Sequence, residues 1–271
     1  MPAHYINGQF TNGVSKEVLE VRNPATEEVV DIVPRGTPED AEAAVSAAKA
    51  AFDEWRRLSI NTRAKLLHEV ASQIRHHTEE LVRLLTLEEG KPIPENEEEL
   101  EWTATTFDYY AELARHERGR VLPSAEESQL NLVIKEPYGV AACIVPWNFP
   151  LLLMAWKVAP ALAAGNTVVI KPSEMTPLSA LYLAEHCFDG LPAGVVNVIT
   201  GYGKEAGEPL VTHPDVAVIA FTGSLATGQR IASLGAPIMK KLHLELGARM
   251  PSSSPTTPTL KWRPKPWPTP R

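Results

Sequence analysis

A lysine and a glutamate stand three residues apart at the end of an apolar run. Residues 168–170 are Val-Val-Ile, which predicts a strand, and Lys171 and Glu174 follow it directly. A carboxylate at the carboxyl end of a strand can accept both hydroxyls of a ribose, and a lysine can donate to the same sugar. For an arbitrary Lys and Glu, a surface ion pair of small energetic value would be the favoured interpretation. The pair is therefore a candidate nucleotide site that needs support from elsewhere in the chain.

A second candidate lies where another predicted strand meets a helix. Residues 220–224 read Ala-Phe-Thr-Gly-Ser, so the strand reaches Gly223 and a helix begins after Ser224. The free N–H groups and the dipole of a helix start suit a phosphate, and the serine hydroxyl adds a donor. A plain serine N-cap is the alternative, because such caps are common.

Residues 201–206 carry the loose pattern Gly-x-Gly-x-x-Ala after a predicted strand. The dinucleotide fingerprint also requires an acid about 20 residues further on, at a strand end. Phe221 lies there instead. The match is weak by itself, since a strand-to-helix turn that uses glycine for its backbone freedom explains it equally well.

Asn148 is flanked by Pro146 and Pro150 within an otherwise apolar run. We expect this amide to be buried, and a buried amide needs hydrogen-bond partners. Asn148 could be held in place to donate to a developing oxyanion. An asparagine that satisfies its own loop is an equally good interpretation.

The second half of the chain predicts a parallel sheet. Its expected strands are separated by helical segments of about 10–15 residues, the spacing of βαβ units. Such sheets bind ligands at the carboxyl ends of their strands, so we expect Lys171, Glu174, Gly203 and Ser224 to converge on one cleft. The expected strands are residues 132–134, 140–145, 167–170, 195–200 and 216–221.

The first part of the chain begins with a hairpin and continues as helices. Asn7-Gly8 between short apolar runs is typical of a two-residue hairpin turn. Thr37 can cap a helix, and Pro38 suits its first position. Together with the sheet, this predicts an α/β protein in which an all-helical front packs beside a Rossmann-like parallel sheet flanked by helices.

Further helices follow in this front part. One begins near Thr62 and carries Arg63 on its surface, and the next runs from Thr78 to Gly90. Residues 95–101 begin another, whose acids we expect to form a solvated face.

Composition excludes some classes of function. The net charge of -7 argues against a nucleic-acid partner, because polyanion binding needs clustered Lys and Arg. Cys143 and Cys187 form no CxxC and no cluster with histidine, so no metal site is expected and both are predicted to be buried. Residues 139–156 are uncharged but interrupted by two prolines, so no membrane span is expected. Residues 1–10 lack a signal-peptide pattern, and a cytoplasmic protein is predicted.

Five segments, in this order, resemble an aldehyde dehydrogenase. The resemblance covers almost everything from the first hairpin to Gly247, and its motifs are highly specific. It implies that residues 1–247 form the family's NAD(P)-binding domain, an incomplete aldehyde dehydrogenase fold. The segments are PWNFP, WKVAPALAAGNTVVIKPSE, GLPAGVVNVITG, FTGS and LELG.

The resemblance also implies which residues would hold the cofactor. Glu174 would favour NAD over NADP, because a 2′-phosphate would meet its carboxylate, although NADP stays possible. Lys171 and Glu174 would contact the adenosine ribose, and Gly203 would contact the adenine. The residues at the pyrophosphate would be Trp147, Gly223 and Ser224.

Three residues would be catalytic by the same resemblance. Asn148 would donate to the oxyanion, Glu245 would be the general base that activates the deacylating water, and Lys157 would assist proton movement. The region near 121–137 resembles the start of the family's oligomerisation arm. Intact relatives are homo-oligomers that act on a small-molecule aldehyde, and this chain is not expected to assemble properly.

The chain departs from the family pattern after its base. The family continues Glu-Leu-Gly-Gly-Lys, whereas this chain reads Glu-Leu-Gly-Ala-Arg. Residues 248–271 hold seven of the 24 prolines and no acid, which predicts a disordered tail produced by a shifted reading frame. The family's FxNxGQxC nucleophile has no counterpart. We therefore expect a truncated, inactive form of an aldehyde-oxidising enzyme, with a non-catalytic nucleotide-binding fragment as the alternative; the aldehyde is not indicated.

Overall fold

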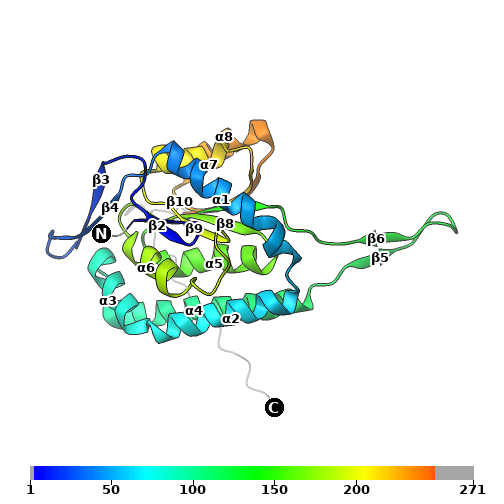
Figure 1. Cartoon of the computed structure of the whole chain (residues 1–271), viewed down its shortest axis with the longest axis horizontal. Coiled ribbons are helices and arrows are strands. Elements are labelled where there is room, and N and C mark those ends of the chain that lie inside the picture. Colours follow the sequence, from blue (N-terminus) through cyan, green and yellow to red (C-terminus); the bar gives the residue numbers. More distant parts are fainter. Residues whose placement is uncertain (1–2, 248–271) are drawn as a thin grey trace, which may run out of the picture.

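A seven-stranded sheet forms the centre of the protein in a computed structural model that describes residues 3–247 (Figure 1). The strands lie in the order β11-β10-β7-β8-β9-β1-β2. Neighbours from β11 to β9 are parallel, whereas β1 and β2 are antiparallel additions at one edge. The predicted α/β fold with a parallel sheet is confirmed. The strands are β1 (His4–Ile6), β2 (Gln9–Thr11), β7 (Val140–Ile144), β8 (Thr167–Lys171), β9 (Val196–Val198), β10 (Val216–Gly223) and β11 (Lys241–Leu246).

Helices cover both faces of this sheet (Figure 1). Successive residues of a strand point to opposite faces, so Ala141 and Cys143 pack into one core and Val140 and Ala142 into the other. The first face carries α2 (Ile60–His76), α3 (Thr78–Glu89), α4 (Ile93–His116), α5 (Pro150–Ala163) and α6 (Leu178–His186). The second carries α1 (Pro38–Arg57), η1 (Gly203–Gly207), α7 (Glu208–Thr212), α8 (Leu225–Gly235) and η2 (Ala236–Ile238).

The predicted turns and caps are present. Asn7 and Gly8 both have positive φ, 53° and 75°, as a two-residue type I′ turn requires. Thr37 accepts from the amide of Asp40, whose side chain in turn accepts from the Thr37 amide, which makes a capping box. Gly90 ends α3 with a φ of 83°, a conformation that glycine adopts without strain.

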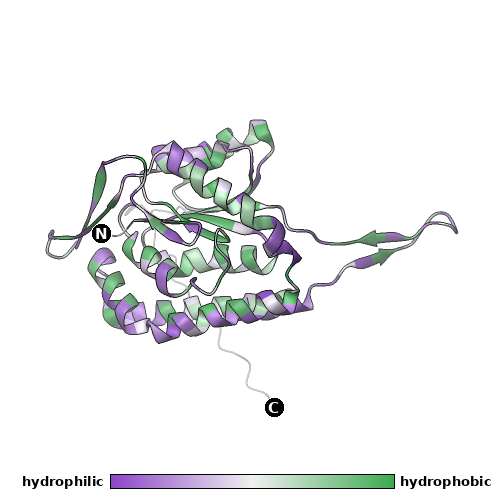
Figure 2. Ribbon diagram, viewed as in Figure 1, coloured by the Kyte–Doolittle hydropathy of each residue, from purple (hydrophilic) through white to green (hydrophobic). Residues whose placement is uncertain are grey.

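Two further hairpins lie outside the main sheet. β3 (Val18–Arg22) pairs with β4 (Val29–Pro34), so the expectation of an all-helical front is wrong. β5 (Arg120–Leu122) pairs with β6 (Asn131–Val133) in an arm that projects from the body (Figure 1). This pairing is antiparallel and separate from the main sheet, so the expectation that residues 132–134 belong to the parallel sheet is wrong. Figure 2 shows hydrophobic residues on this arm, far from either core. The arm coincides with the region expected to start an oligomerisation arm.

Two charged residues predicted on the surface are buried. Arg63 donates from Nε to the Ala163 carbonyl at 3.2 Å and from Nη1 to the Leu58 carbonyl at 2.5 Å. Glu99, expected on a solvated face, has a fully buried side chain. Both correct the sequence interpretation for one reason: carbonyl and amide groups at helix ends need partners, and a charged side chain can supply them.

Within residues 3–247, no helix is long and apolar enough to cross a membrane. The predicted disordered, frame-shifted tail at 248–271 lies outside the described residues.

Candidate functional site

A cavity of about 600 Å³ opens between η1, α7 and α8 on one face of the sheet. Gly203 lines it, and Ile144, the last residue of β7, contributes to its wall. Ile144 stands in register with Lys171 on one side and Phe221 on the other. The cavity therefore lies at the carboxyl ends of parallel strands, where open α/β sheets bind ligands.

The start of α8 borders this cavity. Ser224 caps the helix, because its Oγ accepts from the Thr227 amide at 3.2 Å and lies 2.9 Å from the Thr227 hydroxyl. Ala226 and Thr227, in the first turn, line the cavity. The N-cap interpretation of Ser224 is thus confirmed. A cap does not compete with phosphate binding, since the first amides of a helix have no partner within it.

Gly223 precedes this cap at the end of β10. A Cβ atom built there would lie 2.5 Å from Cζ of Phe221, whose ring is buried. Gly203 is different, because a Cβ atom there would meet nothing within 4 Å. Gly223 is therefore required by packing, whereas Gly203 leaves space open to the cavity.

Lys171 and Glu174 form an ion pair, with Nζ and Oε2 3.2 Å apart. The Lys171 side chain is buried, and Glu174 is 40% exposed. Burial lowers the pKa of Lys171, and the Glu174 carboxylate opposes that effect. Glu174 and the exposed Trp147 stand outside the lining of the cavity. Of the four residues predicted to share one cleft, Gly203 lines the cavity and Glu174 does not. Ser224 directly precedes the first turn of α8, which lines the cavity, and Lys171 is in register with the lining residue Ile144.

The predicted catalytic residues Lys157 and Glu245 come together through a threonine. Lys157 Nζ donates to Thr222 Oγ1 at 2.6 Å, and Thr222 Oγ1 donates to Glu245 Oε2 at 2.8 Å. Nζ lies 3.7 Å from the same carboxylate oxygen. Burial lowers the pKa of Lys157, and Glu245 partly restores it. Thr222 is in register with Glu245 on adjacent parallel strands, which fixes this geometry.

Both cysteines of the chain are buried. Burial raises the pKa of Cys143 and that of Cys187 to about 12 each. A thiol with such a pKa holds almost no thiolate at neutral pH, and thiolate is the nucleophilic form. The prediction that both cysteines are buried is confirmed.

Asn148 is exposed, so the expectation of a buried amide is wrong. Its loop is held through the backbone and the next residue. Lys91 Nζ lies 3.4 Å from the Asn148 carbonyl oxygen and 4.0 Å from the centre of the Phe149 ring. The loop that carries Asn148 is therefore anchored, while the Asn148 side chain itself stays exposed within residues 3–247.

Sequence reasoning missed the buried group behind this loop. Glu99 Oε1 accepts from the amides of Leu151 and Leu152 at 3.0 and 3.1 Å, at the start of α5. Its other oxygen accepts from Lys91. A carboxylate at a helix N-terminus is stabilised by the free amides and the helix dipole. The sequence signal for this burial was the position of Glu99, which lies four residues before Thr103 on the buried side of α4.

A second cavity, of about 470 Å³, was also missed. It lies between α4 and α5 and begins at Phe149, directly after Asn148. Leu152, Leu153 and Trp156 form its α5 wall, and Trp102 stands on α4. Its lining is almost wholly apolar. The spacing of Leu152, Leu153 and Trp156 places them on one face of a helix, and this pattern could have indicated the wall.

Comparison with known proteins agrees with this arrangement. The model of the aldehyde dehydrogenase family matches residues 10–252. Betaine aldehyde dehydrogenase 1 of Oryza sativa subsp. japonica is 46% identical, over 91% of this chain and 51% of that protein. Aminoaldehyde dehydrogenase 2 of Zea mays is 43% identical with the same coverage.

Solved structures give the same result. An E. coli NADP dependent enzyme superposes with a TM-score of 0.89 at 38% identity, over 91% of this chain and 52% of that one. Betaine aldehyde dehydrogenase from Staphylococcus aureus, in complex with NAD+, gives 0.87 at 38% identity, over 91% and 49%. The chain spans about half the length of the relatives it matches.

Proposed function

Because this chain belongs to the aldehyde dehydrogenase family, we propose that it binds NAD(P)+ and forms the cofactor-binding half of an aldehyde-oxidising enzyme. One observation supports this above the others: the 600 Å³ cavity at the carboxyl ends of the parallel strands. Its size lies within the usual range of small-molecule sites, about 300–1,000 Å³. The open space at Gly203 fits a flat ring, and the start of α8 fits a phosphate.

The proposed roles of the remaining cofactor residues rest on the family to which the chain belongs. The Lys171–Glu174 pair would hold the adenosine ribose, with Glu174 accepting from its hydroxyls and disfavouring a 2′-phosphate. Gly223 and Ser224 would border the pyrophosphate, and Trp147 would lie near it. NAD+ is therefore proposed as the preferred cofactor, while a relative described as NADP dependent keeps NADP+ as the second candidate.

The chemistry supplied by the bound cofactor is acceptance of hydride at the nicotinamide. Within this chain, Glu245 would take a proton from water at Oε2, the oxygen that Thr222 already contacts. The Lys157 ammonium lies 3.7 Å from this oxygen. The exposed amide of Asn148 would donate to an oxyanion.

The apolar cavity next to Asn148 would hold the non-reacting part of the aldehyde. Phe149 joins the two, since it follows Asn148 and lines the cavity. Aromatic and aliphatic walls favour a substrate whose body is apolar over one that carries a carboxylate. The aldehyde itself stays undefined.

This polypeptide is proposed to bind nucleotide without oxidising aldehydes. Its two cysteines are buried, and neither offers a thiolate for attack on a carbonyl. A non-catalytic nucleotide-binding role is the second candidate for the chain as it stands. The two proposals share the cofactor site and differ in turnover.

Calorimetric titration of the chain with NAD+ and NADP+ tests the shared site. We expect saturable binding that favours NAD+, and a smaller preference in Glu174→Gln. Gly203→Trp should abolish binding, because a Cβ there meets nothing within 4 Å and the indole can enter the cavity that Gly203 lines. Gly190→Trp is the matched control, as a Cβ there also meets nothing within 4 Å. A folded chain that binds neither nucleotide, or equal binding by both tryptophan variants, would refute the proposal.

A further inference from the structure

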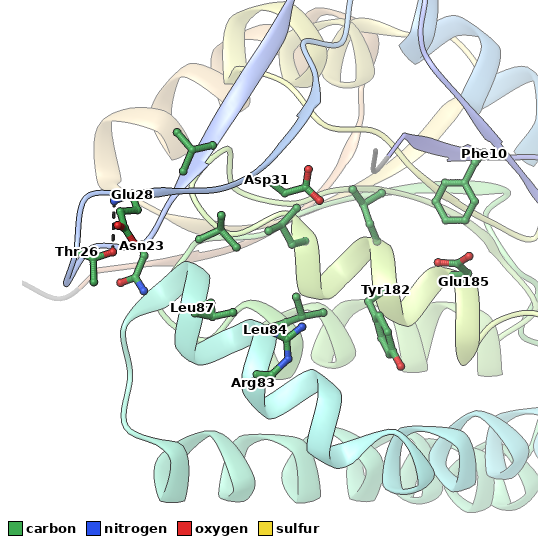
Figure 3. Close-up of a pocket in the computed structure, with 14 residues that line it drawn as sticks. Phe10, Asn23, Thr26, Glu28, Asp31, Arg83, Leu84, Leu87, Tyr182 and Glu185 are labelled. Atoms are coloured by element: carbon green, nitrogen blue, oxygen red, sulfur yellow. Dashed lines mark hydrogen bonds between the residues drawn. The ribbon is translucent and has the colours of Figure 1, made fainter.

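A further cavity is separate from the nucleotide site. Its volume is about 730 Å³, and it lies between the β3–β4 hairpin, α3, α6 and β2 (Figure 3). Its lining shares no residue with the 600 Å³ nucleotide cavity or the 470 Å³ apolar cavity. No step of the proposed function uses it.

Leucines of α3 and α6 and valines of β4 form an aliphatic part of the lining of this cavity. Leu84 and Leu87 stand one turn apart on α3, and Leu178 and Leu181 stand one turn apart on α6. Val29, 43% exposed, faces them from β4. An apolar molecule of a few carbon atoms would cover the surface of Val29, Leu84 and Leu87 that now faces water.

Acidic groups surround the opening. In Figure 3 the carboxylates of Asp31 and Glu185 point toward the space between the hairpin and α6. Asp31 Oδ1 accepts from the neighbouring Ile32 amide, which leaves its charge in place. Glu28 also lines the cavity, and the bonds found at this residue within the described chain come from its backbone.

The one basic residue of the lining is already engaged. Arg83 donates from Nε and Nη2 to the carboxylate of Glu80, at 3.2 and 2.6 Å. Glu185 has a weaker partner, the ring of His186 at 3.4 Å. Three carboxylates therefore face the cavity against one guanidinium that a fourth carboxylate neutralises. Such a charge balance attracts cations and repels anions.

Two aromatic rings complete the lining. Phe10 is 40% exposed and packs edge-on against Tyr5, with ring centres 5.4 Å apart. Tyr182 is fixed by a hydrogen bond of 3.0 Å between its hydroxyl and His77 Nδ1. Aromatic faces attract ammonium groups, and held rings do so without further loss of side-chain freedom.

From the volume, aliphatic walls, unbalanced carboxylates and aromatic rings of this cavity, we propose that it binds a small aliphatic ammonium ion. The hydrocarbon part lies against the α3 and α6 leucines. The ammonium group lies on the side of the cavity toward which Asp31 and Glu185 point, and Glu28 adds negative charge farther along the lining.

Isothermal titration with n-hexylammonium chloride tests the site, with hexanoate and 1-hexanol as probes of equal chain length. We expect hexylammonium to bind at least tenfold more tightly than either. Added salt should weaken only hexylammonium binding, because it screens the carboxylates. Equal affinities for the cation and the alcohol would overturn the proposal.

Variants locate the binding. The combined replacement Glu28→Gln, Asp31→Asn, Glu185→Gln should lower hexylammonium affinity at least tenfold, whereas Glu69→Gln, an exposed acid on α2, should leave it unchanged. All three replaced side chains are at least partly exposed, so the fold should persist, as circular dichroism would verify. Saturating NAD+ should not alter hexylammonium affinity. Competition with NAD+, or an unaffected triple variant, would place the cation elsewhere and refute the proposal.

Discussion

Replacement of Glu99 by alanine should be among the most damaging single changes in this chain. The side chain is fully buried, and it accepts from two amides at the start of α5 and from Lys91. Alanine would leave the two amides without their acceptor, and Lys91 would keep only more distant partners, Glu89 at 3.2 Å and the Asn148 carbonyl at 3.4 Å. Removing one partner of a buried pair costs about 3–5 kcal/mol. Because 10% of the Lys91 side chain is exposed and can recover some water, we expect about 3 kcal/mol.

Urea denaturation followed by circular dichroism would measure this loss. Glu98→Ala is the matched control, since Glu98 precedes Glu99 on the same helix and is exposed, and it should cost less than about 0.5 kcal/mol. Lys91→Met combined with Glu99→Ala should cost less than the sum of the two single changes, because the Lys91–Glu99 pair is lost only once. A loss below about 1 kcal/mol for Glu99→Ala, or strictly additive effects, would show that the cap and the ion pair contribute little.

Three further outcomes follow from the buried charges and thiols. Burial raises the pKa of Glu89 from its ordinary 4.5 to about 7, so the folded state binds this proton more tightly than the unfolded state does. The protonated Glu89 therefore stabilises the fold fully below pH 4.5, and this stabilisation is lost as the pH rises to 7. The unfolding free energy of wild type relative to Glu89→Gln should accordingly fall between pH 5 and pH 8. Glu245→Gln should lower the pKa of Lys157 further, measured by nitrogen NMR, because a supporting charge is removed. Cys143 and Cys187 should react with a thiol reagent only after denaturation, and the chain should form no NADH with aldehydes.

The sheet was predictable because its strands are short apolar runs bounded by glycine and proline. Residues 167–170 and 216–221 were recognised for this reason, and both lie within observed strands. β11 was missed, although Lys241–Leu246 alternates polar and apolar residues, the pattern of a strand that is half-buried at a sheet edge. The β3–β4 hairpin was missed because Glu27, with a φ of 61°, turns the chain without a glycine.

The site was predictable only at the level of residue types. Resemblance indicated Lys157 and Glu245, but Thr222 between them is set by the pairing of two parallel strands, which no local pattern reveals. The burial of Asn148 was wrongly expected, because flanking prolines fix a loop without enclosing it. Glu174 and Gly203 could be named from sequence, yet their separation across the strand ends required coordinates.

The burial of Glu99 has a counterpart that explains why the helical front cannot be separated from the site. Glu88, at the end of α3, accepts from the amides of Leu178 and Ser179 at 2.7 and 3.0 Å, at the start of α6. Each carboxylate thus supplies a cap that the capped helix lacks in its own sequence, since neither α5 nor α6 has a side-chain cap of its own. α5 carries Lys157, and α6 follows the loop of Glu174. Loss of α3 and α4 would therefore remove the caps of α5 and α6, the helices next to the cofactor residues, even though neither α3 nor α4 lines the nucleotide cavity.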